Sequence, residues 1–185
     1  YRYSEAQILN TFESFHKLRG DATEITRVQS IDVVKGSDET TIPICNLAMM
    51  MPFFDLRPGR IRLLENGVFQ AMAAVMLAIE HLNTGNGTLV AEVEGLNQRC
   101  PIKFNLEALD SGLYEVESVN HVITLISRQP GVERVPCAFL GAARSAVSIP
   151  SATISGLKGF PQLSPISTSS KLDDSKSFPL FGRTI

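Results

Sequence analysis

The chain has 185 residues, of which 44% are hydrophobic and 19% are charged, and this is the composition of an ordinary globular domain. Its formal net charge of -2 gives no electrostatic reason to expect nucleic acid or an anionic membrane as a partner. No apolar run approaches the ~20 residues that a membrane span needs. We therefore expect one domain with a sizeable core and no nucleic-acid partner.

Residues 1–41 form an N-terminal region whose pattern differs from the rest. Residues 4–19 read as an amphipathic helix, which Ser4 and Gln7 begin as a capping box. A short strand is expected over 30–34. We treat 1–41 as an N-terminal helix with an extension, and 42–185 as the main domain.

A regular alternation of strands and helices begins at Ile42. Short apolar runs predict strands over 42–51, 102–109, 138–141 and 162–166. Helical periodicity predicts helices over 65–83, 115–128, and from Ser145 or Ser148 to about 157. Pro150 fits the first turn of the last helix if Ser148 is its cap.

This order predicts an α/β fold in which a parallel sheet carries helices on both faces, because crossovers between parallel strands are right-handed. The first two strands should be adjacent. The core stripe of the first helix should be Val68, Ala71, Met72, Val75, Ile79 and Leu82, and that of the second Val116, Val119, Ile123 and Ile126.

The turn Gly141–Ser148 is the strongest local signal for binding. Its small residues let the backbone approach a ligand, and a helix N-terminus favours an anionic group. Arg144 could pair with a carboxylate or lie solvated on the surface. The hydroxyl cluster 167–170 could bind a ligand's ammonium or carboxylate group, or simply cap the segment that follows.

The sequence offers no catalytic machinery, and we expect neither an enzyme nor a cofactor. Glycine-rich nucleotide motifs and the G-x-S-x-G nucleophile motif are absent. Asp110 follows a strand, but no histidine or nucleophile can be paired with it, so it reads as a cap. The isolated histidines read as structural or surface residues; they are His16, His81 and His121.

The three cysteines lack CxxC spacing, so a zinc site is not expected. Cys45 and Cys137 lie in apolar strand-like runs and read as buried free thiols, with one disulfide as the alternative. Asn86-Gly87-Thr88 is a sequon for N-glycosylation in a polar loop.

Four segments resemble a known family: Ala74–Asn83, Leu106–Ser111, Gly141–Ser148 and Phe160–Thr184. The last has the form P-Q-L-S…S…L-D-D…F-P-L-F-G-R-T. They are similar to the type I periplasmic-binding-protein-like ligand-binding region shared by class C G-protein-coupled receptors and natriuretic peptide receptors. Within it they look most like the GABA-B and metabotropic glutamate receptor ectodomains.

The resemblance covers 42–185 and implies the first lobe of a two-lobed clamshell, with the second lobe and a membrane-spanning region beyond Ile185. A carboxylate-binding serine of relatives falls at Arg144 or Ser145, beside the backbone N–H group of Ala143. A threonine that binds the amino-acid head falls at Thr168, and the GABA-B pattern offers Ser167 to Ser169. A tryptophan of that receptor falls at Arg57.

The resemblance implies an extracellular lobe that binds an amino-acid-like small molecule and signals by clamshell closure. It also implies a glycoprotein on the plasma membrane that can form a homo- or heterodimer. Two alternatives stay open within the family: a ligand-less dimerisation subunit and a soluble, secreted or periplasmic solute-binding protein. An exposed apolar stripe on the first or second helix would favour dimerisation. An α/β enzyme of another type would need an acid–base pair at the strand-end cleft.

Overall fold

The computed structural model describes residues 42–59, 62–63, 67–130 and 132–185. The helix expected over 4–19 and the strand expected over 30–34 lie outside these residues, as does the N-terminal region as a whole.

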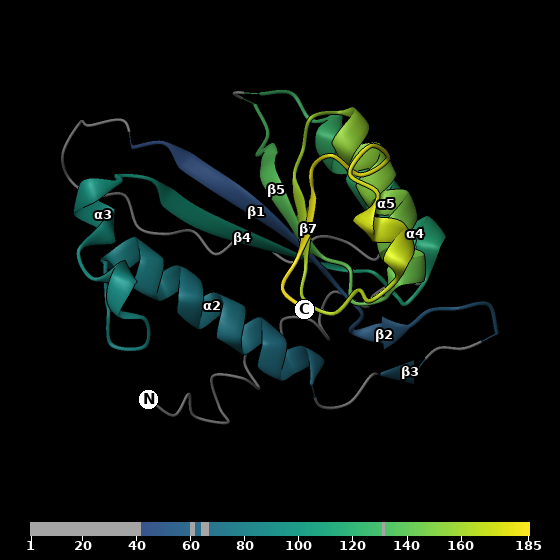
Figure 1. Cartoon of the computed structure of the whole chain (residues 1–185), viewed down its shortest axis with the longest axis horizontal. Coiled ribbons are helices and arrows are strands. Elements are labelled where there is room, and N and C mark those ends of the chain that lie inside the picture. The colour runs from purple at the N-terminus through teal and green to yellow at the C-terminus, as the bar shows by residue number, and fades with distance from the viewer. Residues whose placement is uncertain (1–41, 60–61, 64–66, 131) are drawn as a thin grey trace.

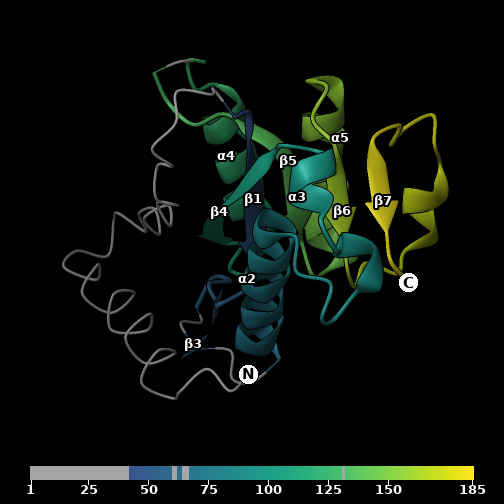
Figure 2. The same ribbon diagram turned by 90° about the vertical axis from the view of Figure 1, so that its left-hand side faces the viewer.

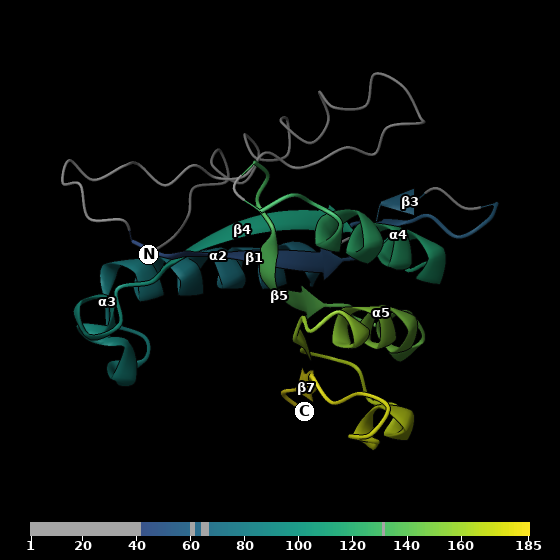
Figure 3. The same ribbon diagram turned by 90° about the horizontal axis from the view of Figure 1, so that it is seen from above.

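A five-stranded sheet forms the centre of the fold, in the order β4-β1-β5-β6-β7, and every neighbouring pair is parallel. Its strands are β1 (Ile44–Met51), β4 (Lys103–Asp110), β5 (Pro136–Gly141), β6 (Gln162–Ser164) and β7 (Phe181–Arg183). The four predicted strands thus lie in one parallel sheet with the first two adjacent, which confirms the predicted topology. Figure 3 shows the strands in succession from β4 to β7.

Three long helices flank the sheet: α2 (Val68–Thr84), α4 (Glu115–Ile126) and α5 (Ser145–Leu157). Figure 1 shows α2 on one side and α4 and α5 on the other, and Figure 2 shows α2 in front of β1. The predicted α/β class with helices on both faces is confirmed.

Two hydrophobic clusters lie on opposite faces of the sheet, and β1 contributes side chains to both, as expected of a strand buried on two faces. Met49 and Met51 pack toward α2 in a cluster with Met72, whereas Ala48 and Met50 pack toward α4 and α5. Val75 and Ile79 of α2, which were predicted to face the sheet, pack against the first of these clusters, so that prediction is confirmed. Leu82, the last residue of the predicted stripe, is not part of this cluster.

The predicted inner stripe of α4 is right at Ile126, which packs against the core, but wrong at Val116 and Ile123. Val116 and Ile123 are 49% and 46% exposed, while the buried residues are Ser118, Val122 and Leu125. Two stripes of α4 fit helical periodicity about equally well. The stripe that packs against the sheet contains Ser118, and the choice by apolarity alone therefore favoured the more apolar stripe.

Short elements fill the connections. The loop after β1 contains the antiparallel pair β2 (Phe54–Asp55) and β3 (Arg62–Leu63). A 3₁₀ turn (Ala91–Val93) and α3 (Leu96–Arg99) connect α2 to β4, and a second 3₁₀ turn (Ser170–Asp173) precedes β7. None of these was predicted, and β7 was missed because three residues are too few to show a period.

A disulfide joins Cys45 and Cys137, with 5.3 Å between their Cα atoms. This corrects the prediction that both are buried free thiols; both are half-buried. The pairing follows from the register: Asn46 lies opposite Pro136 and Leu47 opposite Ala138, so Cys137 lies at the register shift beside Cys45. Cys100 is free and exposed.

Helix α5 starts at Ser145, with Arg144 as its N-cap residue. Neither predicted serine is therefore the cap, although Ser145 is the first residue of the helix, and Pro150 is accommodated inside it. Ser148 consequently lies within the helix and is buried rather than capping it.

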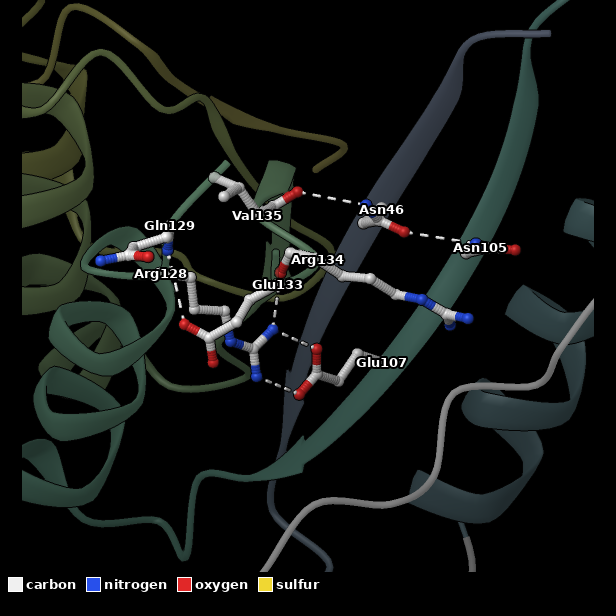
Figure 4. A network of polar contacts seen from close by, with 8 residues as sticks. All are labelled: Asn46, Asn105, Glu107, Arg128, Gln129, Glu133, Arg134 and Val135. Carbon is white, nitrogen blue, oxygen red and sulfur yellow. Dashed lines mark hydrogen bonds and ion pairs between the residues drawn. The ribbon is translucent and has the colours of Figure 1, made fainter. Parts of the chain in front are cut away.

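A buried polar network fixes the α4–β5 connection over the sheet (Figure 4). Arg128 makes a two-pronged ion pair with Glu107 of β4, at 2.6 Å to Oε2 and 2.7 Å to Oε1, and also donates to the Arg134 carbonyl. Asn46 of β1 donates to the Val135 carbonyl. These bonds attach both ends of the connection to the strands beneath it.

Candidate functional site

The carboxyl ends of β1, β4, β5 and β6 all lie at one edge of the parallel sheet, where α/β proteins bind ligands. At this edge, the turn after β5 packs closely against the end of β1. Gly141 has a φ of 106°, and a Cβ atom there would lie 2.1 Å from the Met50 carbonyl oxygen of β1. Only glycine allows the strand to turn into α5 so close to β1.

Side chains of α5, β6 and the following loop hold the carbonyl groups of this turn inward. The Gly141 carbonyl accepts a bond of 2.8 Å from Gln162 Nε2. The Ala142 carbonyl accepts bonds from three buried hydroxyls, those of Ser148, Ser164 and Ser167. The turn is therefore fixed from beneath by polar groups that are themselves satisfied.

The backbone N–H groups that follow are available. In the part of the chain that the structure describes, the N–H groups of Ala143, Arg144 and Ser145 have no protein acceptor. A helix leaves its first N–H groups without partners, and its dipole adds a partial positive charge there. This turn is thus suited to a carboxylate or another small anion.

Ser145 links this turn to the loop after β6. Its hydroxyl oxygen accepts bonds of 3.0 Å each from the backbone N–H groups of Thr168 and Ser169. The two strand-end loops therefore form one continuous edge. The Ser145 hydroxyl proton still allows that group to donate.

The structure brings four of the predicted site residues together: Ala143, Arg144, Ser145 and Thr168. Arg144 and Thr168 are exposed, whereas Ala143 and Ser145 are half-buried. Ser167 differs, because it is fully buried and bonded to Ser148 and Ser164 below the turn. Its hydroxyl supports the site from inside. That these residues bind a ligand stays a prediction.

Arg57 is engaged elsewhere. It forms a two-pronged pair with the buried carboxylate of Asp55, at 2.8 Å from Nε and 2.6 Å from the outer nitrogen. This hydrogen bonding raises the pKa of Arg57, and Glu115 of α4 adds a smaller attraction. These contacts hold Arg57 on the loop after β1.

Sequence reasoning missed three supporting residues: Gln162, Ser164 and Arg183. Gln162 and Ser164 alternate along β6 and so share one face, which would have been a signal once that strand was assigned. Arg183 belongs to the F-G-R-T string, and it donates to the carbonyls of Ser167 and Ser169.

Asp110 organises the same edge on the β4 side, in line with its interpretation as a cap. One carboxylate oxygen accepts the backbone N–H groups of Phe53, Phe54 and Gly112, which joins the loops after β1 and β4. The other oxygen is buried with no hydrogen-bond partner among the described residues. His121 of α4 contacts the Asp110 backbone carbonyl at 2.9 Å.

Burial raises the pKa of Asp110 more than the three amide bonds and His121 lower it. Between the ordinary aspartate pKa and this raised value, the folded chain binds more protons than the unfolded chain. Stability should therefore fall as pH rises through that window. As pH rises through this window, the free energy of unfolding of wild type should fall relative to that of Asp110→Asn. Urea unfolding of the two proteins at a series of pH values measures this difference. Parallel pH curves for the two proteins would contradict this.

The predicted sequon lies in the turn after α2. The Asn86 side-chain oxygen accepts bonds from the backbone N–H and the hydroxyl of Thr88, and Thr88 is exposed.

Among the described helices, none has the length and apolarity to cross a membrane. The described residues also contain no cluster of three or more acidic, histidine or cysteine side chains arranged to hold a metal ion.

Comparison with known families gives one clear result. The sequence profile of the receptor family ligand-binding region matches residues 70–185, more than half of the chain. A search of curated proteins gave no significant match. The matched segment runs from α2 to the end of β7 and so includes the turn after β5 and the loop after β6. The chain belongs to the receptor family ligand-binding region.

Proposed function

We propose that this member of the receptor ligand-binding family is the first lobe of an extracellular sensor for an amino-acid-like small molecule, and that it has no enzymatic activity. The observation that carries the proposal is the joined edge at the start of α5. There, the N–H groups of residues 143–145 lie beside exposed Thr168, and Ser145 connects the two loops.

The chemistry of this edge suits a zwitterion. A ligand carboxylate would accept bonds from the backbone N–H groups, where the helix dipole strengthens them. Arg144 adds a positive charge when it turns inward. The Thr168 hydroxyl can accept a bond from an ammonium group.

Signalling would follow from closure of a second lobe. The ligand binds this lobe first, and closure over it shifts a two-state equilibrium that further domains of the receptor read. The first lobe by itself should bind weakly, since a second lobe would contribute further contacts and exclude water.

The Cys45–Cys137 disulfide supports an extracellular location, because such bonds persist in oxidising compartments. The exposed Thr88 of the sequon is consistent with a glycoprotein, and occupancy of Asn86 is part of the proposal.

Dimerisation is the second candidate function, and one observation favours it. Val116 and Ile123 lie seven residues apart on the outer face of α4 and are about half exposed. An apolar stripe of this kind is often covered by a partner. A ligand-less partner subunit would use this face and leave the edge at α5 empty.

Substitution of the proposed ligand contacts provides the test. In the full-length receptor, calorimetry against a panel of free α- and ω-amino acids should first identify a binding compound. Thr168→Ala and Ser145→Ala should then each weaken its affinity about five- to a hundredfold, because one hydrogen bond to a charged group contributes ~1–3 kcal/mol.

Thr153→Ala is the matched control, since Thr153 is an exposed threonine on α5 whose hydroxyl bonds to the Ile149 carbonyl. It should leave affinity unchanged. Full affinity in both site variants would place the ligand elsewhere. A receptor that binds none of the panel but dimerises through α4 would favour the silent-partner function.

A further inference from the structure

The loop formed by residues 167–169 is held from two opposite sides. On one side, the Ser145 hydroxyl oxygen accepts the N–H groups of Thr168 and Ser169 at 3.0 Å each. On the other side, one terminal nitrogen of Arg183 donates to the carbonyls of Ser167 and Ser169, at 3.3 Å and 3.2 Å. Two different elements, α5 and β7, thus bind groups of this loop, in addition to the local bonds from the Leu172 N–H to the Ser169 carbonyl and from the Ser167 N–H to the Ser164 hydroxyl.

The position of Arg183 follows from the sheet. Arg183 is the last residue of β7 and lies opposite Ser164, the last residue of β6, and the Thr184 N–H bonds to the Ser164 carbonyl. Its side chain therefore leaves the sheet at the point where the β6 chain turns into the 167–169 loop.

Asp173 completes the arrangement by pairing with the other terminal nitrogen of Arg183. The Asp173 side chain is 58% exposed, whereas that of Arg183 is 23% exposed. The guanidinium thus binds two carbonyls with one nitrogen and a carboxylate with the other. A planar group with five fixed donors on three nitrogens can do this at once, whereas a lysine ammonium carries its three donors on one nitrogen.

We propose that Arg183 is a positioning residue that fixes the 167–169 loop against the start of α5, with Ser145 as its counterpart on the other side. Arg183 acts through the loop and not by touching a ligand. Its effect on binding depends on the function proposed above, since it would preorganise Thr168 at the edge. The two-sided hold on the loop itself does not depend on any ligand.

Amide hydrogen exchange tests the hold directly, in the full chain and without a ligand. In Arg183→Gln, the amides of Thr168 and Ser169 should exchange about tenfold faster or more, because the loop can open locally more easily once the two bonds from Arg183 are lost. The amides of Val122 in α4 and Leu109 in β4 are the internal reference and should keep their rates.

Two further variants make the result specific. Asp173→Asn removes the exposed ion pair but leaves both carbonyl bonds, so its exchange rates at Thr168 and Ser169 should stay within about threefold of wild type. Arg183→Lys keeps the charge but not the fork, so it should give intermediate rates. If Arg183→Gln does not fold, Arg183→Lys is compared with Asp173→Asn in the same way.

Unchanged exchange at Thr168 and Ser169 in the Arg183 variants would overturn the proposal. An equal acceleration at Val122 and Leu109 would also overturn it, because Arg183 would then stabilise the whole sheet. Faster exchange confined to the loop supports it whether or not an amino acid binds, so its failure and that of the proposed function are distinguishable.

Affinity extends the test to the site. For the compound that the amino-acid panel identifies, Arg183→Gln should weaken binding about tenfold, Arg183→Lys should restore part of it, and Asp173→Asn should leave it unchanged. If Arg183→Gln speeds exchange in the loop but leaves affinity unchanged, Arg183 fixes the loop but does not contribute to ligand binding.

Discussion

Replacing Cys45 or Cys137 by alanine should lower the free energy of unfolding by about 4–5 kcal/mol, because the disulfide between them closes a loop with a sequence separation of 92. The bond restricts the unfolded chain more than the folded one, and this restriction grows with loop length. It also joins two adjacent strands of the sheet, β1 and β5, near their amino ends. A loss of this size is a large part of the stability of an ordinary domain.

Urea unfolding at equilibrium measures the effect, with Cys100→Ala as the matched control. Cys100 is free and exposed, so its replacement should change stability by less than about 0.5 kcal/mol. Wild type treated with a strong reductant should resemble Cys45→Ala. Denatured but unreduced wild type should titrate one thiol, and a count of three would refute the bond.

Four of the five strands of the central sheet and α2 were predictable because each has a clear local signal. The apolar run ending in Met49–Met51 indicated a strand buried on both faces, and helical spacing in α2 identified the stripe that packs on it. Together with the alternation of elements, these patterns predicted the parallel sheet.

The disulfide depends on information that no local pattern contains. It requires β1 and β5 to be neighbours and Cys137 to lie at a register shift, and both are properties of the assembled sheet. The inner face of α4 was missed for a related reason, since burial of Ser118 becomes clear only when the neighbouring elements are in place.

In the candidate site, too, some features have a local sequence signal and others depend on the assembled sheet. The turn after β5 was visible as a small-residue segment entering a helix. Which hydroxyl of the 167–170 cluster turns inward was not visible, because only the packed β6 shows that Ser167 lies beneath the turn while Thr168 is exposed. The contribution of Arg183 likewise depends on β7, a strand of three residues.

Neutralising Glu107 should be the second large effect, with Glu107→Gln lowering the free energy of unfolding by about 3–5 kcal/mol. The Glu107 and Arg128 side chains are 13% and 6% exposed, so the pair is largely shielded from water. Hydrogen bonding to Glu107 is the main cause that raises the pKa of Arg128. Glutamine keeps one neutral acceptor oxygen but removes the negative charge, so Arg128 would remain as a buried cation bonded to neutral acceptors such as the Arg134 carbonyl.

Asp173→Asn is the matched control, because it also removes a carboxylate that pairs with an arginine, but in an exposed pair that should contribute less than about 1 kcal/mol. The double variant Glu107→Gln/Arg128→Met should recover part of the loss, since it leaves no unpaired charge in the interior. Urea unfolding of wild type, Glu107→Gln, Asp173→Asn and the double variant measures the loss and its partial recovery. Equal small losses in Glu107→Gln and Asp173→Asn would mean that water reaches Arg128 and that the α4–β5 connection is not held by this pair.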